Sequence, residues 1–163
     1  WDIMNHIISV LVENKAGVLA KISGLFSRRG FNIESLAVGP TDDEKISRIT
    51  MEVNAEEHSI EQIIKQLHKL INVIKIQELD PSNIVERELV LIKVSADSKT
   101  RPEILEIVSV FRANIVDVAK KTLMIEITGN SKKVKALEDL LRPFGILELV
   151  RTGKIACTRG GKY

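Results

Sequence analysis

The chain has 163 residues, enough for one domain of ordinary size or two small ones. Hydrophobic residues make up 44% and charged residues 28%, which excludes extensive disorder. The formal net charge of +2 is too small for a general nucleic-acid binder. No segment approaches the roughly 18–20 consecutive apolar residues that a membrane-spanning helix needs. Aromatic residues are only 4% of the chain, so it has no platform for stacking bases.

Residues 5–79 alternate between strand and helix patterns. Residues 7–12 form a near-continuous apolar run rich in β-branched side chains, which predicts a strand covered on nearly both faces. A helix follows and ends at Gly30. The remaining elements are strands at 32–38, 46–53 and 73–79 and a helix whose apolar stripe is Ile60, Ile63, Ile64, Leu67 and Ile71. The order is therefore βαββαβ.

The same order restarts after the linker-like stretch Asp80-Pro81-Ser82-Asn83. The spacing of Thr100 and Glu103 predicts a capping box at the start of a helix, and Ser131 is the expected cap of the next one. The expected strands are 89–94, 114–118, 123–127 and 146–150, and the expected helices run through 104–111 and 134–141.

We therefore predict an α+β chain of two ferredoxin-like βαββαβ units, each a four-stranded antiparallel sheet with two helices on one face. The units are expected at 5–79 and 87–150, with a linker at 80–86 and a basic C-terminal tail at 151–163. In this topology the second strand lies at an edge of its sheet, where its backbone groups can pair with another chain. Units of this size have small cores, so we expect self-association.

The predicted tail carries four basic residues and no acidic one: Arg151, Lys154, Arg159 and Lys162. It is either a solvated tail or a docking segment for an acidic partner. Cys157 is the only cysteine, which excludes an internal disulfide and favours a reducing compartment, so we expect a cytoplasmic protein. The N-terminus from Trp1 to His6 has no basic region typical of a signal peptide.

The sequence offers no candidate catalytic or metal-binding set. The histidines are His6, His58 and His68, and we expect the last two on the surface of a helix. No Cys/His cluster has the spacing of metal ligands. Cys157 has Lys154 and Arg159 nearby, which would favour a thiolate, although an unreactive tail thiol is the simpler interpretation. We assign no catalytic residue and no metal ligand.

The junction of the first strand and the first helix is the strongest candidate site. Free backbone N–H groups at a helix start attract a carboxylate, helped by the helix dipole. Gly17 lets a ligand approach the backbone closely, and the Asn14 amide can bind an ammonium or a carboxylate group. The residues of this loop are Asn14, Lys15, Ala16, Gly17, Val18 and Leu19.

Asn32 opens the expected edge strand. If two chains pair through this strand, Asn32 of one chain lies near the Asn14 loop of the other. Val18, Leu19 and Ile33 would then line a pocket for an aliphatic amino acid. The alternative is purely structural: Asn14 caps a helix and Gly17 permits a turn.

Several segments resemble the small, regulatory subunit of acetolactate synthase (acetohydroxyacid synthase), and they cover essentially the whole chain. An ACT domain of any kind would match only the first loop and the topology. The matching segments are Asn14-x-x-Gly17-Val18-Leu19, residues 24–36, Pro40-Thr41-Asp42, Ser47-Arg48, and residues 66–70, 85–89 and 111–117.

The resemblance implies an N-terminal ACT domain that dimerises side by side and binds valine at the dimer interface, with Asn14, Gly17 and Asn32 at the family's valine-site positions. It implies that the small subunit activates a separate catalytic (large) subunit and confers feedback inhibition by valine in branched-chain amino-acid biosynthesis. That large subunit carries thiamine diphosphate, magnesium and FAD. This chain departs from the family at Lys15-Ala16, where acidic or small polar residues are common.

Two other functions remain open at this stage. One is a free-standing amino-acid sensor that acts on a different partner; the lack of a helix-turn-helix segment or a strongly basic domain argues against direct DNA binding. The other is a stand-alone enzyme that uses Cys157.

Overall fold

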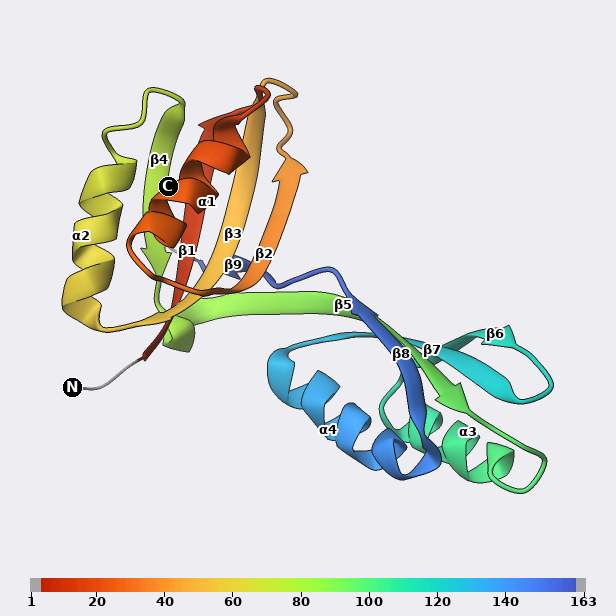
Figure 1. Cartoon of the computed structure of the whole chain (residues 1–163). Helices are drawn as coiled ribbons and strands as arrows, with labels where there is room; N and C mark the ends of the chain where they lie inside the picture. Colours follow the sequence, from red (N-terminus) through yellow and green to blue (C-terminus); the bar gives the residue numbers. More distant parts are fainter. Residues whose placement is uncertain (1–3, 161–163) are drawn as a thin grey trace. The chain divides into compact units, whose positions relative to one another are not determined.

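The computed structural model of the chain describes residues 4–160 (Figure 1). Trp1 and Lys162, which enter the sequence analysis, lie outside these residues. The chain forms two compact units. The first contains the described residues up to Val85 together with those from Lys154 onward, and the second is Glu86–Gly153. No helix within residues 4–160 is long and apolar enough to cross a membrane.

The first unit is an antiparallel sheet with the strand order β2-β3-β1-β4 and two helices on one face (Figure 1). Apolar side chains of β1, β3, α1 and α2 form its core. The predicted position of the second strand at a sheet edge is confirmed, because within residues 4–160 β2 pairs with β3 alone. The elements are β1 (Met4–Glu13), α1 (Val18–Arg28), β2 (Ile33–Pro40), β3 (Ile46–Ala55), α2 (Glu57–Leu67) and β4 (Val73–Leu79).

The second unit repeats this topology, with the strand order β6-β7-β5-β8 and its own apolar core. The predicted pair of ferredoxin-like βαββαβ units is therefore confirmed. A short 3-10 helix, η1 (Pro81–Asn83), precedes it. The elements are β5 (Ile84–Ser95), α3 (Arg101–Val110), β6 (Asn114–Val118), β7 (Thr122–Gly129), α4 (Ser131–Leu141), the 3-10 helix η2 (Arg142–Phe144) and β8 (Ile146–Arg151).

The first helix of each unit ends in the same hydrogen-bonded motif. After α1, the N–H of Gly30 donates to Ser27 and that of Phe31 to Phe26, and the two phenylalanine rings meet edge to face. This is a Schellman motif with a left-handed residue at Gly30, φ 75°. The second unit forms the same motif after α3, but its left-handed residue is Arg112, φ 53°. Asn32 and Asn114 therefore occupy equivalent positions.

Three local expectations are wrong. The stripe of the second helix does not reach Ile71, which is 93% exposed, because α2 ends at Leu67 and Leu70 packs against the core instead. Thr100 and Glu103 do not form a capping box, because Thr100 makes no side-chain cap. The last helix is capped one residue earlier than expected, by Asn130, whose side chain accepts from the N–H of Lys133.

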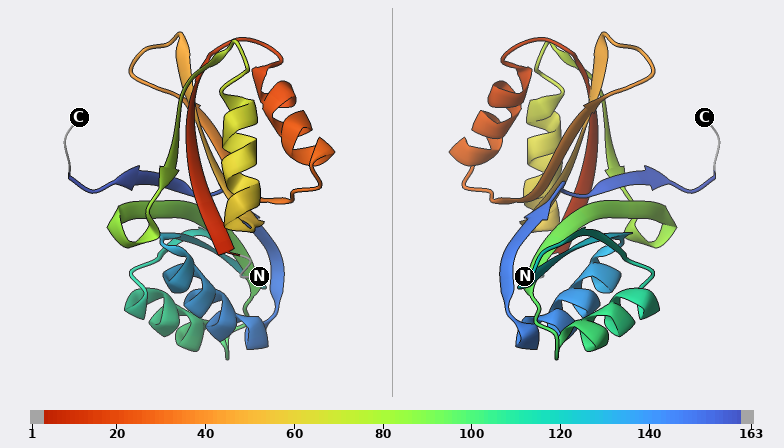
Figure 2. Two further views of the ribbon diagram at one scale, coloured as in Figure 1. Left: turned by 90° about the vertical axis from the view of Figure 1, so that its left-hand side faces the viewer. Right: turned by 90° about the vertical axis from the view of Figure 1, so that its right-hand side faces the viewer.

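The expectation of a solvated basic tail is also wrong for Arg151, Lys154 and Arg159, which make contacts within the fold. Arg151 ends β8 and contacts the carboxylates of Glu138 at 2.9 Å and Glu88 at 3.7 Å. Lys154 is buried, and Arg159 donates to the carbonyl of Ile84. Between them lies a further strand, β9 (Ile155–Thr158), which crosses the face of the first sheet away from its helices and carries the exposed Cys157 (Figure 2). Sequence patterning missed this return of the chain to the first unit.

The two helix ends give a direct test of backbone strain. A left-handed conformation costs an L residue about 1 kcal/mol relative to glycine. Arg112→Gly should therefore raise the free energy of unfolding of the second unit by about 1 kcal/mol, measured by urea denaturation with circular dichroism. Gly30→Ala should lower the free energy of unfolding of the first unit by a similar amount, because its new Cβ would meet no atom within 4 Å and only the backbone strain would count. Equal stability of Arg112→Gly and the wild type would contradict the strain.

Candidate functional site

The loop between β1 and α1 is anchored to two other turns of the first unit. The backbone N–H of Asn14 donates to the carbonyl of Lys45 at 2.8 Å, and its side-chain Nδ2 donates to the carbonyl of Glu44 at 3.0 Å. On the other side, Glu13 accepts from Nδ2 of Asn72 at 3.1 Å. The loop is therefore tied to the β2–β3 hairpin and to the turn before β4. Asn14 does not cap the helix, contrary to the structural alternative; its side chain instead holds the loop to the hairpin.

Lys15 points outward and is already paired. Its Nζ lies 2.9 Å from Oε2 of Glu13, and its side chain is 68% exposed. Hydrogen bonds from Lys15 and then Asn72 hold the pKa of Glu13 below its usual value. The ammonium group of Lys15 therefore stands at the rim of the loop, where Glu13 neutralises it.

Gly17 leaves the start of α1 open. It adopts a left-handed conformation, φ 85°, and a Cβ built there would meet nothing within 4 Å. The helix has no side-chain cap and no acidic residue in its first turn. The N–H of Val18 makes a long hydrogen bond of 3.5 Å to the carbonyl of Lys15. Because no side chain caps the turn, the positive end of the helix dipole still faces an opening that an anion could enter. The left-handed conformation fits the alternative in which Gly17 permits a turn, and the open space beside it leaves room for a ligand to approach the backbone.

The side chains next to Gly17 divide into core and surface. Val18 is buried and packs with Ile22 and Phe26 in the core of the first unit. Leu19 and Ala16 are exposed. Leu19 is therefore the apolar side chain that this loop offers to a ligand, and Val18 fixes the helix beneath it.

Asn32 and Ile33 do not lie near this loop within one chain. They follow α1, whereas the loop precedes it, so an 11-residue helix of about 16 Å separates the two groups (Figure 1). Asn32 is exposed and donates to Oε1 of Glu34 at 3.0 Å, and Ile33 is half-buried against the core. A complete set of the expected residues requires a second chain.

The equivalent loop of the second unit has the opposite character. Asp97 accepts from the N–H groups of Lys99 and Thr100, and Pro102 removes a further N–H from the first turn of α3. Arg101 donates to the carbonyls of Ala119 and Lys120, at 2.7 and 3.1 Å.

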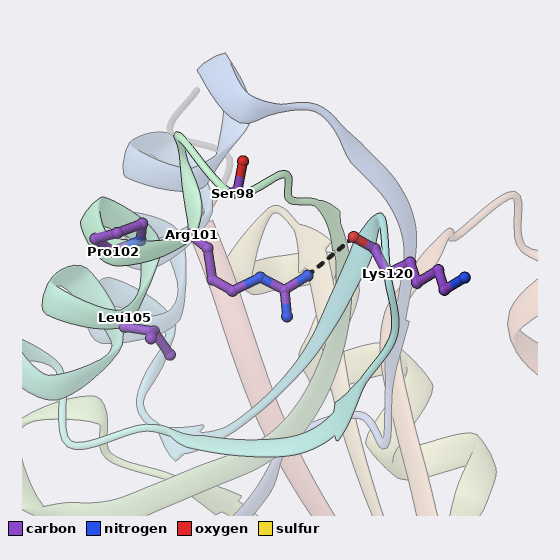
Figure 3. Close-up of a pocket in the computed structure, with 5 residues that line it drawn as sticks. All are labelled: Ser98, Arg101, Pro102, Leu105 and Lys120. Carbon is purple, nitrogen blue, oxygen red and sulfur yellow. Dashed lines mark hydrogen bonds between the residues drawn. The ribbon is translucent and has the colours of Figure 1, made fainter.

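A cavity of about 550 Å³ remains beside this loop, lined by Ser98, Arg101, Pro102, Leu105 and Lys120. Figure 3 shows the Arg101 guanidinium reaching the Lys120 carbonyl, while the Lys120 side chain extends away from the other four. The turn before α3 is therefore bonded to Asp97 and the helix begins with a proline, two features that the turn before α1 lacks.

The first unit is an ACT-type domain, as its topology allows and as its match to a family model shows. Residues 8–75 match the family described as AHAS small subunit-like ACT domain, and residues 87–160 match the family described as small subunit of acetolactate synthase. The chain belongs to the acetolactate synthase small subunit family. The resemblance seen in the sequence is thereby confirmed.

Individual relatives agree with this assignment over their full length. The chain is 55% identical over 159 residues to a probable acetolactate synthase small subunit of Archaeoglobus fulgidus, covering 98% of this chain and 99% of that one. It is 55% identical over 155 residues to an acetolactate synthase small subunit of Mycobacterium bovis, covering 95% and 92%. The crystal structure of the acetolactate synthase small subunit of Thermotoga maritima matches with a TM-score of 0.91 and 43% identity, covering 98% of this chain and 100% of that one.

The cap of α3 predicts a pH dependence confined to the second unit. Backbone hydrogen bonds from Thr100 and Lys99 hold the pKa of Asp97 below its usual value. A carboxyl group whose pKa is lowered on folding stabilises the fold at pH values above its unfolded-state pKa, near 4. This stabilisation is lost as pH falls through the folded-state pKa.

Asp97→Ala should lower the midpoint of thermal unfolding at pH 7 and weaken its decline below pH 4. Asp97→Asn retains an acceptor oxygen and should stay closer to wild type at pH 7. An Asp97→Ala curve parallel to wild type at every pH would contradict this role.

Proposed function

We propose that this chain is the regulatory subunit that activates the catalytic chain of acetolactate synthase and makes it sensitive to valine. The observation that carries the proposal is the uncapped start of α1 at Gly17, in a unit whose edge strand β2 begins with Ile33, directly after Asn32. Membership of the small-subunit family supports the catalytic chain of acetolactate synthase as the partner, since a small subunit acts with a larger one. The family match gives no support to a sensor with a different partner.

Valine binds at the start of α1 through its two charged groups. Its carboxylate accepts from the first N–H groups of the helix, close to the backbone of Gly17. Its ammonium group donates to Oδ1 of Asn14, because Nδ2 of that side chain is committed to Glu44. Its isopropyl group packs on Leu19 and on Ile33 of a second chain. Lys15 and Ala16 form the rim of the site, and Val18 positions the helix.

Two chains complete the site by pairing their β2 strands. Antiparallel pairing of two copies of an edge strand brings the Ile33 end of one next to the Pro40 end of the other. The Pro40 end leads into the hairpin that holds Asn14. Each pocket therefore combines the Asn14–Leu19 loop of one chain with Asn32 and Ile33 of its partner, and the dimer has two equivalent pockets.

The chemistry of the reaction belongs to the separate catalytic chain, which carries thiamine diphosphate, magnesium and FAD. The small subunit acts by favouring one state of that chain. A coupling free energy of about 1–3 kcal/mol between valine and the catalytic chain gives about 5- to 150-fold regulation. Valine must therefore bind one arrangement of the regulatory dimer more tightly than another.

Reconstitution tests the function directly. Adding this chain to the catalytic subunit from the same organism should raise the rate of acetolactate formation several-fold, and valine should then lower it. Valine should have little effect on the catalytic subunit alone. An unchanged rate with an equimolar excess of this chain would refute the proposal.

Gly17→Asp should abolish the response to valine, because a carboxylate at this position repels that of valine and occupies its space. Aspartate tolerates a left-handed conformation better than most residues, which limits the loss of stability. The expected result is more than a tenfold rise in the valine concentration for half-inhibition, with activation retained.

Ser98→Asp is the matched control, because it places a carboxylate in the equivalent loop of the second unit. It should leave valine inhibition unchanged. The loop assignment would be wrong if Gly17→Asp and Ser98→Asp were equally sensitive to valine.

Val38→Lys should weaken the dimer. Val38 is 48% exposed on β2, so the substitution leaves the core intact and places two ammonium groups on the strands that pair. Val118→Lys is the control, since Val118 is 62% exposed on β6, the edge strand of the second unit. Sedimentation velocity should show a shift to monomer for the first variant only. A dimer of unchanged affinity in Val38→Lys would place the interface elsewhere.

A further inference from the structure

The residues that follow the second unit cross the first sheet on the face opposite its helices. Cross-strand neighbours on this face form a row of four: Ser35 pairs with Glu52, Glu52 with Ile7, and Ile7 with Leu79. The row runs across β2, β3, β1 and β4. Residues Lys154–Ala156, here named the strap, lie along it, since Lys154 contacts its first two members and Ala156 packs with the other two.

Lys154 is the polar anchor of the strap. Its backbone N–H donates to Oγ of Ser35 at 2.8 Å, and its Nζ lies 3.1 Å from Oε1 of Glu52. The side chains of Lys154 and Glu52 are 9% and 15% exposed. A charge this deeply buried is tolerated only when it is paired, so loss of the Lys154 ammonium group removes the cation that lies beside the buried Glu52 carboxylate. Lys154 therefore contacts both Ser35 of β2 and Glu52, the residue that faces Ser35 on β3.

This anchor is attached at the irregular start of the edge strand. The pairing of β2 with β3 shifts in register between Ile33 and Ser35, which weakens the ladder at that point. The only strand that pairs with β2 in the described chain is β3. The hydrogen bond from Lys154 to Ser35 thus gives β2 a second attachment directly after the bulge, two residues from Ile33.

We infer that the strap fixes the start of β2 and that Lys154 is its positioning residue. The second unit is inserted in the chain between β4 and the strap, so the strap connects its end to the strand that carries Asn32 and Ile33. If β2 forms part of the valine pocket, Lys154 influences the affinity of that pocket for valine without contacting the ligand. This extension rests on the proposed function.

Hydrogen exchange of the full chain tests the strap without reference to valine. Lys154→Met keeps the aliphatic stem and removes the charge, and Ser35→Ala removes only the acceptor on β2. Both should speed the exchange of amides in residues 33–40 several-fold and leave residues 57–67 of α2 unchanged. Lys93→Met is the control, because it removes an exposed ion pair with Glu148 in the second unit and should leave residues 33–40 as in wild type.

Two results would overturn the inference. One is unchanged exchange in residues 33–40 of both Lys154→Met and Ser35→Ala. The other is an equal rise in β2 and α2 in Ser35→Ala, which would mean a general loss of stability. Calorimetry with valine then tests the extension: Ser35→Ala should weaken binding several-fold. If the wild-type chain binds no valine, the proposed function fails while the exchange result still decides whether the strap holds β2.

Discussion

Backbone groups that need a partner from outside one chain determine the behaviour of the first unit. The start of α1 has no side-chain cap, and β2 lies at the edge of its sheet. A helix start of this kind favours an anion, and an edge strand favours another strand. In the proposed function both needs are met when two chains pair and valine enters, which would couple ligand binding to dimer formation.

The second unit shows that this opening is a local feature and does not follow from the fold. It has the same order of elements and the same helix-end motif, yet Asp97 and Pro102 satisfy or remove the N–H groups at the start of α3. Arg101 then ties that helix start to the β6–β7 turn. One topology thus supports an open and a closed helix start, and a few residues after the first strand decide which is formed.

The alternation of apolar residues was enough to predict both units, because each strand buries one face on its own helices. Local interpretation failed where distant packing decided the outcome. Ile71 continues a helical pattern, but α2 ends four residues earlier, and Thr100 yields its expected capping role to Asp97. The return of Lys154 to Ser35 and Glu52 joins residues about a hundred positions apart, which no short pattern reveals. The Asn14–Leu19 loop was singled out because it joins a strand to a helix and combines an asparagine amide with a glycine, while the buried role of Val18 required the structure.

Analytical ultracentrifugation with and without valine tests the central claim most directly. If each pocket takes residues from two chains, valine must lower the dissociation constant of the dimer, and dilution to monomer must weaken valine binding by the reciprocal factor. The account predicts at least a tenfold lower dimer dissociation constant at saturating valine. Saturable binding to the monomer, with the same dimer dissociation constant in both conditions, would contradict it.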